Sequence, residues 1–566
     1  PTAVPQATEP PEAEMMAGKK TAPKFADYWN PPTDVYGEPV YGGTLRINYE
    51  DPLQHANVWG AGGGGSDRFR NPTMNVLVME DPYDAAAPLI PDLAEAWINH
   101  EDNQGITFLF REGTKWHNGA DFICEDARFT FQTWITGEGI TASRMKAALS
   151  NVDLDGLECE DDLTLTVRYT GPTVTGLLAI SDRRAVIFNK EWFLEGGEEA
   201  MFQDASVGTG PFIWSEGQEV GFDEQHFERN PDYFIKELPY VDELVTFGIL
   251  EESTQQAQML AHQTDWHWVR NFGQYEAYVE HDQIQTVIRA TRGHVSLWLN
   301  KRNPPFDNVR VRQAVIMGID RAVAIEILQE GFGSLGFIMA PGSPWELNRE
   351  KGCAVPGWCV AEDMEAQRAE AKKILEEEGF DFDKIYLFTV ESDRQVVNRA
   401  TLVQEQLRLL GINTDFDLVE SVARNQQLTQ GTWGDILPRN DTMPKDDPDP
   451  GMGQYFRCTS TGNHWMPGLD CDERMEGLLD QVASTIDPVE RKRLSDEMQL
   501  YAMEQYWKFP IYWEQEAVSF WPEVRGYAHF PAPFGSYRKH MHMWIDPAHK
   551  DDKGFKGQTT GIPGGL

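Results

Sequence analysis

The chain has 566 residues, which predicts two or three domains rather than a single hydrophobic core. Its 49 Lys and Arg residues are outnumbered by 90 Asp and Glu residues, so the formal net charge at pH 7 is −41. A surface with this charge repels phosphate backbones and anionic lipid headgroups, and we therefore expect no nucleic-acid partner.

The first 24 residues contain no aromatic residue and are rich in Pro, Ala, Glu and Thr. Such a composition cannot bury enough apolar surface to fold, so we interpret residues 1–39 as a disordered tether and lead-in. The sequence starts without a Met and shows no signal peptide, which favours a processed protein exported to the periplasm or another extracytoplasmic space. A lipid-bearing Cys upstream of Pro1 would fit this tether.

Strand patterns dominate the part of the chain up to Asn300. YGGTLRINY (41–49) predicts a strand after a Gly-Gly turn, and a glycine run, GAGGGG (60–65), follows it. LTLTVRYT (163–170) alternates with period two, as a strand of a hairpin does. HVSLWLN (294–300) predicts a strand in a sheet interior, with Trp298 as a packing residue.

Helices are expected after Asn300. DNVRVRQAVIMGIDRAVAIEILQEG (307–331) has apolar residues at helical spacing and ends in Gly, which is a helix stop signal. Two further segments of this kind, starting at Asp363 and Ala400, are each followed by a strand-like run. Alternating helices and strands predict an α/β domain with helices packed on a sheet. YWKFPIYWEQEAVSFW (506–521) again predicts strand, and we expect it to rejoin the first domain.

The six cysteines fall into three pairs that are close in sequence: Cys124 with Cys159, Cys353 with Cys359, and Cys458 with Cys471. None of them forms a CxxC motif, which argues against a zinc site or a thioredoxin-like site. For an exported protein we predict three disulfides that close local loops. Six buried free thiols are the alternative.

Three patterns imitate ligand-binding motifs. GFGSLG (331–336) matches GxGxxG, but it follows a predicted helix instead of a strand, so a helix C-cap and turn explain it. NVDLDGLECEDD (151–162) approximates a calcium loop, yet it starts with Asn, ends with Asp and precedes a strand, so we favour an acidic hairpin turn. His540 and His542 lie on one face of a predicted strand and could chelate a metal, but no carboxylate or Cys cluster accompanies them.

No HExxH, GxSxG or P-loop sequence is present, so the sequence predicts no enzyme, no metal centre and no cofactor. LFREGTKWHNGADFICEDARFTF (109–131) raises one remaining question. It places His117 in a turn between a strand pattern and an amphipathic run, where a histidine could act as an exposed base or could be structural.

Several blocks of the sequence, in order, resemble the family 5 extracellular solute-binding proteins of ABC importers, the dipeptide-, oligopeptide- and nickel-binding group. The resemblance extends from about residue 41 to about residue 521. The blocks are PDLAEAW, ITFLFREGTKWHNGADFICEDARFTF, GTGPF, RNPDYF, NPPFDNVRVRQAVIMGIDR, AEAKKILEEEGF, LVQEQLRLLGI and DPVERKRLSDEMQ. In this family the turn around His117 belongs to domain II, away from the ligand, which makes His117 structural.

The resemblance implies an α/β, periplasmic-binding-protein-like fold with three domains in total: two lobes that close on a ligand and an extra domain II. The implied ranges are 40–75, 205–298 and 507–566 for domain I, 76–204 for domain II, and 299–506 for domain III. The two crossings between the lobes imply a hinge near Leu299–Asn300 and again near Phe509–Tyr512. A membrane permease would recognise the closed form.

The resemblance also implies a binding site in domain III. Peptide binders carry an Asp before an Asp-Pro or Glu-Pro step that pairs with the terminal ammonium of the peptide, and KDDPDPGMGQYF (445–456) offers Asp446 there. FRCTSTGNHWMPGLDC (456–471) resembles a disulfide-closed loop of dipeptide binders. Met443 and Lys445 depart from the pattern, and Lys445 would partly neutralise the site. The candidate ligand-binding residues are Asp446, Asp447, Asp449, Trp433, Asn463, Trp465 and Trp59.

We therefore expect a monomeric binding protein that captures a peptide-like solute between its lobes and delivers it to a membrane permease. The same scaffold binding an oligosaccharide or another small organic solute is the main alternative, because the chain has 18 Trp residues and carries Lys445. A nickel or other metal chelate is a less favoured ligand. A secreted hydrolase is the alternative from a different class. The three carboxylates could also form a solvated acidic turn.

Overall fold

The structure is a computed structural model. It describes residues 37–49, 71–81, 89–137, 145, 149, 151–182, 185–203, 207–217, 219, 223–269, 271–460, 462, 463, 471–527, 540–553 and 556–560. Within these ranges, no helix combines the length and the apolar character that crossing a bilayer requires.

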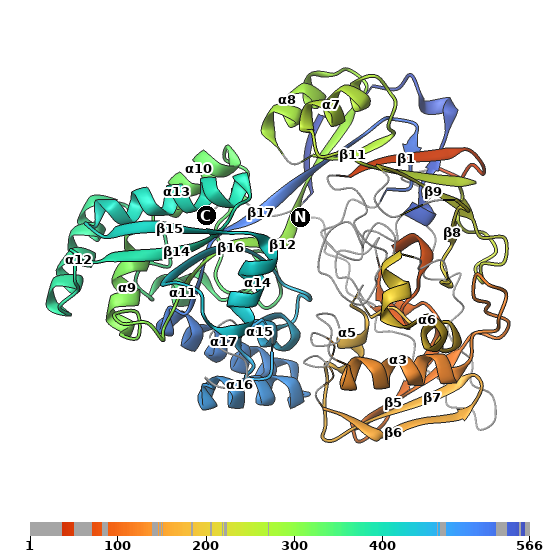
Figure 1. Ribbon diagram of the computed structural model, residues 1–566, viewed down its shortest axis with the longest axis horizontal. Helices are drawn as coiled ribbons and strands as arrows, with labels where there is room; N and C mark the ends of the chain where they lie inside the picture. Colours follow the sequence, from red (N-terminus) through yellow and green to blue (C-terminus); the bar gives the residue numbers. More distant parts are fainter. Residues whose placement is uncertain are drawn as a thin grey trace, which may run out of the picture.

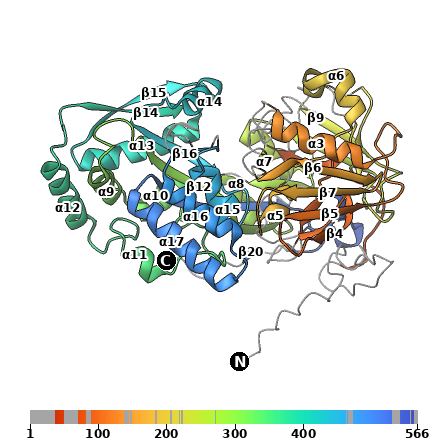
Figure 2. The same ribbon diagram turned by 90° about the horizontal axis from the view of Figure 1, so that it is seen from below.

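Two lobes are joined by a pair of long neighbouring strands, β12 (Gln285–Leu299) and β17 (Lys508–Phe520), as Figures 1 and 2 show from two directions. These strands are central in one mixed sheet that extends through both lobes, in the order β15-β14-β16-β12-β17-β11-β1-β10-β9-β8. The other strands on this path are β15 (Asn413–Val419), β14 (Ile385–Glu391), β16 (Ile436–Thr442), β11 (Trp266–Val269), β1 (Thr44–Tyr49), β10 (Glu243–Gly248), β9 (Glu224–Arg229) and β8 (Phe212–Trp214).

The buried apolar side chains form two separate cores. The first core, in lobe 1, draws on residues 45–287 and 518–544, and the second core, in lobe 2, draws on residues 295–513. Between the cores, β12 has an irregularity in its pairing with β17 from Ala290 to His294, and residues 514–517 of β17 are half-buried. The positions near 299–300 and 509–512, where the family resemblance implied a hinge, lie inside the second core, and Leu299 and Phe509 are fully buried there.

Lobe 1 carries an additional antiparallel sheet of order β4-β5-β7-β6, covered by helices (Figure 1). Cys124, the first residue of α3, forms a disulfide with Cys159 on β6, so the helix is covalently linked to the sheet. The elements of this lobe are β2 (Val78–Glu80), β3 (Leu89–Pro91), β4 (Ala94–Asn99), β5 (Gly105–Phe110), α3 (Cys124–Thr136), β6 (Val152–Asp161), β7 (Thr164–Tyr169), α5 (Gly176–Ile180), α6 (Lys190–Gln203), α7 (Glu252–Leu260), α8 (Phe272–Glu280), β18 (Val524–Arg525), β19 (Trp544–Ile545) and η3 (Pro547–His549).

Lobe 2 is the predicted α/β domain, with β14 and β15 parallel and helices around them. Most of its helices begin at an Asp or Asn whose side chain accepts a backbone N–H of the first turn, as Asp320, Asp393 and Asp487 do. Its remaining elements are α9 (Val309–Met317), α10 (Arg321–Gln329), α11 (Arg349–Cys353), α12 (Met364–Glu377), α13 (Arg394–Leu409), α14 (Ser421–Gln430), α15 (Pro448–Phe456), α16 (Glu473–Ser484) and α17 (Pro488–Gln505). Two short strands, β13 (Gly333–Ser334) and β20 (Lys556–Thr560), add to the main sheet.

All three predicted disulfides are present, so the alternative of six free thiols is wrong. GFGSLG follows α10, where Glu330 adopts left-handed φ and Gly331 has φ +91°, which confirms the C-cap and turn. The strand prediction for His540 and His542 is wrong, because residues 540–542 form a 3-10 turn in which both side chains are buried. Their presumed common strand face therefore does not exist.

Both ring nitrogens of His117 form hydrogen bonds with backbone atoms, so the side chain is not an exposed base. His117 Nδ1 accepts the Gly208 N–H at 3.3 Å, which leaves Nε2 to donate to the Gly210 carbonyl at 3.0 Å. A Cβ at Gly208 would lie 1.8 Å from the Thr73 carbonyl oxygen, so only glycine permits this approach. Neighbouring Trp116 is 1% exposed and donates to Asp126 at 3.0 Å.

We predict that His117→Ala and Gly119→Ala each lower the free energy of unfolding by about 1 kcal/mol, visible as a lower thermal midpoint. The first change deletes the bond to Gly210. The second places a Cβ at φ +87°, where space is open but the backbone is strained. Glu112→Gln, on the same hairpin and exposed, is the matched control and should leave the midpoint unchanged. Midpoints equal to wild type in both variants would refute a structural role for this turn.

Candidate functional site

Three carboxylates at the start of α15 lie where lobe 2 faces lobe 1, and they have different environments. Asp447 is the N-cap of α15 and accepts the Asp449 N–H at 3.0 Å. Its two oxygens also receive Arg491 in a bidentate pair at 2.7 and 2.8 Å, and the side chain is almost fully buried. Asp447 therefore fixes the start of the helix and has little free surface for a ligand.

Asp449, the second residue of α15, connects the two lobes. Its Oδ1 accepts from Arg457 at 2.8 Å, and its Oδ2 accepts from the hydroxyl of Thr175 in lobe 1 at 2.7 Å. Both oxygens are thus used by the protein itself, and one of the two partners comes from the opposite lobe.

Asp446 differs from both neighbours. Its Oδ1 accepts the Ser343 hydroxyl at 2.5 Å, and within the described ranges no Lys or Arg nitrogen lies within 4 Å of its carboxylate. Burial raises the pKa of Asp446 above its ordinary value, although the Ser343 bond and the field of Arg292 act in the opposite direction. A partly buried carboxylate with a neutral partner is suited to receive a cationic group.

Lys445, the departure expected to neutralise the site, points away from Asp446 toward lobe 1. Its Nζ lies 3.2 Å from Glu80 Oε1 and donates to the Ser181 carbonyl at 3.1 Å. Burial by itself would raise the pKa of Glu80, but the fields of Arg292 and Lys445 lower it below the ordinary value. The ammonium of Lys445 is therefore paired with Glu80 of lobe 1 and not with Asp446.

None of the candidate ligand-binding residues outside this carboxylate run is seen in a partly buried position between the lobes like that of Asp446. Trp433 is 2% exposed in the second core, and Asn463 is 3% exposed with its side chain donating to the Arg457 carbonyl at 3.3 Å. Both offer little surface to a ligand. Trp59 and Trp465 lie outside the described residues.

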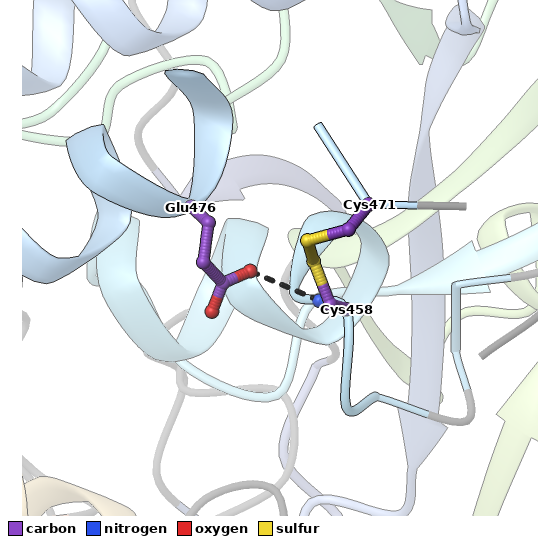
Figure 3. A group of neighbouring side chains, drawn as sticks. All are labelled: Cys458, Cys471 and Glu476. Atoms are coloured by element: carbon purple, nitrogen blue, oxygen red, sulfur yellow. Dashed lines mark hydrogen bonds between the residues drawn. A yellow bond between two sulfur atoms is a disulfide. The ribbon is translucent and has the colours of Figure 1, made fainter. Parts of the chain in front are cut away.

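Figure 3 shows the disulfide between Cys458 and Cys471, which follow α15 in the sequence, with Glu476 beside it. Glu476 on α16 accepts the Cys458 N–H at 3.0 Å and pairs with Arg457 at 3.0 Å, and Arg457 in turn holds Asp449. Two sulfurs and a carboxylate this close could suggest a metal site. Because both sulfurs are in the disulfide, no thiolate is available, and the group acts as a structural clamp.

The sequence did not point to Ser343, Thr175, Arg491, Glu80 or Arg292. Each is a common polar residue far along the chain from the carboxylate it meets, so only the folded arrangement reveals it. The Asp-Asp-Pro-Asp run was the one local signal, because Pro after an acidic residue favours a helix start.

Comparison with known proteins gives a consistent result. The sequence model of the bacterial extracellular solute-binding proteins, family 5 Middle, matches residues 88–463. Heme-binding protein A of Haemophilus influenzae is 23% identical over 475 residues, which cover 79% of this chain and 82% of the relative. Further relatives at 22–24% identity are named as oligopeptide-, dipeptide- or di/tripeptide-binding proteins.

Two solved structures share the fold. The periplasmic binding protein AgaA of A. tumefaciens R10, in complex with agropinic acid, has a TM-score of 0.77 and 20% identity, covering 90% of this chain and 100% of that one. The periplasmic binding protein DppA of Helicobacter pylori, in complex with the peptide STSA, has a TM-score of 0.76 and 18% identity, covering 89% and 98%.

We predict that replacing Cys458 and Cys471 together by Ala lowers the free energy of unfolding by about 3 kcal/mol, because the lost bond closes a loop of about 14 residues. Thermal unfolding measures the effect. Replacing Cys353 and Cys359, which are 6 positions apart, is the matched control and should lower it by about 2 kcal/mol. Intact-mass alkylation without reductant should label no cysteine in the wild type, and labelling of Cys458 or Cys471 would contradict the assignment.

Proposed function

The chain belongs to the bacterial extracellular solute-binding proteins of family 5, and on that basis we propose that it captures a peptide-like solute between its lobes for an ABC importer. The observation that carries the choice of ligand is Asp446. It is partly buried where the lobes meet, it is held by the neutral hydroxyl of Ser343, and the cations around it are bound to other carboxylates.

A terminal ammonium is the natural partner of such a carboxylate. Transferring an isolated ammonium from water into a closed cleft costs several kcal/mol unless an opposite charge compensates it. Asp446 supplies that charge, and Ser343 orients one of its oxygens so that the other can face the ligand. The relatives named for peptide binding support this choice. The oligosaccharide alternative rested on the Trp content and on Lys445. Trp433 is buried, and Lys445 pairs with Glu80 of lobe 1.

Function then consists of affinity and a change of shape, without covalent chemistry. Ligand bound between the lobes stabilises the closed form, which a permease in the membrane recognises. The separation of the two cores supports assigning residues 299–506 to domain III and placing the hinge at residues 288–294 and 514–517. We place the protein outside the cytoplasm as a monomer. The tether predicted for residues 1–39 lies outside the described residues up to residue 36.

A cycle of one mutation and one ligand modification tests the role of Asp446. Ligand released from the purified protein is identified by mass spectrometry, and the peptide found is synthesised with a free and with an acetylated amino terminus. We predict that Asp446→Asn weakens binding of the free peptide by about thirtyfold or more, because one partner of a desolvated charge pair is lost. Acetylation should weaken binding to the wild type equally and hardly affect the variant.

Asp383→Asn, which removes an exposed carboxylate from the same lobe, is the control and should bind like the wild type. Asp447 and Asp449 are unsuitable controls because each holds an Arg in place. Calorimetry gives all affinities. If the released ligand is an oligosaccharide, or if Asp446→Asn binds the free peptide as tightly as the wild type, the peptide proposal fails.

A further inference from the structure

Three buried charged side chains from three separate parts of the chain meet where the lobes touch. Glu80 ends β2 in lobe 1, Arg292 lies on β12 between the two cores, and Lys445 precedes α15 in lobe 2. Glu80 is 5% exposed, Arg292 7% and Lys445 3%. We call these three residues the closing latch.

The distances make Glu80 the centre of the latch. Arg292 Nη2 donates to both Glu80 oxygens at 3.3 Å, and Lys445 Nζ lies 3.2 Å from Glu80 Oε1. The other donors of the two cations go to backbone carbonyls, Arg292 to Pro444 at 3.0 Å and Lys445 to Ser181 at 3.1 Å. Lys445 thus reaches two acceptors of lobe 1, and both contacts require the lobes to be together.

Two further contacts cross between the lobes at some distance from the latch in sequence. Val174 donates its backbone N–H to the Ala483 carbonyl at 2.9 Å, and the Thr175 hydroxyl donates to Asp449 at 2.7 Å. These contacts depend on the lobe arrangement and involve no latch residue. They therefore report on closure independently of the latch.

The energetics suit a reversible device. A buried ion pair gains little over two hydrated charges, because desolvation offsets much of the attraction. When the lobes separate, Glu80 and Lys445 can both return to water, so the latch need not lock the protein shut. Removing Glu80 is different, because the closed form then contains Lys445 and Arg292 without the carboxylate that both of them contact. Removing Lys445 leaves Glu80 paired with Arg292 but deletes the contact that crosses from lobe 2 to lobe 1.

We propose that Glu80 is a positioning residue for ligand capture: it pairs with Lys445 across the lobes and so stabilises the closed arrangement that places Asp446 opposite lobe 1. Lys445 and Asp446 are adjacent, so the side chain held by lobe 1 and the carboxylate offered to the ligand move as one unit. Only the last step, the effect on ligand affinity, rests on the proposed function. Closure itself can be tested without any ligand.

The test is hydrogen exchange of the Val174 amide, followed by mass spectrometry on protein from which ligand has been removed by unfolding and refolding. We expect Glu80→Gln to speed exchange at Val174 by about thirtyfold or more relative to the wild type. Amides of β5 and β7, which pair within lobe 1, should exchange at the wild-type rate. Lys445→Met removes the partner from lobe 2 and should act in the same direction, so the test holds even if Glu80→Gln perturbs lobe 1.

The double variant E80Q/K445M and the control Glu112→Gln complete the design. The double variant lacks the unpaired Lys445 cation and should exchange at Val174 more slowly than Glu80→Gln alone. Glu112→Gln should match the wild type. The proposal is overturned if Val174 exchanges equally fast in the wild type and both single variants, or if the wild-type amide shows no protection. If the latch variants behave as expected but no peptide is found to bind the wild type, the latch stands and only the proposed function is refuted.

Discussion

The structure depends on two hydrogen-bonded strands, β12 and β17, that belong to two hydrophobic cores at once. Their ends are buried in different lobes. Between these ends both strands carry polar side chains, β17 is half-buried at residues 514–517, and the pairing is irregular between Ala290 and His294 of β12. A polar middle section separates the cores because charged and amide side chains there cannot join either apolar interior. The main sheet is therefore continuous through both lobes, whereas the apolar interiors are separate.

Buried charged side chains connect the central strands to each other and the two lobes to each other. Asp441 on β16 accepts from Ser296 and Trp298 of β12 at 2.8 Å and lies 3.3 Å from Lys508 at the start of β17, so it ties the three strands together inside lobe 2. The Lys508 field and the Trp298 bond hold the pKa of Asp441 below its ordinary value in spite of burial. That network lies within one lobe, whereas the Glu80 pair spans two. The Asp441 network connects strands of a single lobe. The Glu80–Lys445 pair exists only where the two lobes are in contact.

Local patterns predicted the helices of lobe 2, the disulfide pairs and the turn at His117, because their signals lie within a few residues of one another. The strand prediction at His540 and His542 failed because a short alternating segment resembles a strand even when tertiary contacts impose a 3-10 turn. The hinge near residues 299–300 and 509–512, which the family resemblance implied, stays a prediction, and the boundary between the two cores lies several residues away from it. Asp446 was found by resemblance, but its partner Ser343, 103 positions away, had no sequence signal.

The division of the chain between the two cores also constrains how the protein acquires its structure after export. The second core uses one continuous segment, residues 295–513, so it can form as soon as that segment is available. The first core needs residues 518–544 as well as residues from the beginning of the chain. When the chain becomes available from its amino terminus onward, the first core therefore receives its first residues early but is completed last. Until then, β1, which carries the apolar residues Leu45 and Ile47, lacks its contact with β19, which lies more than 450 residues downstream.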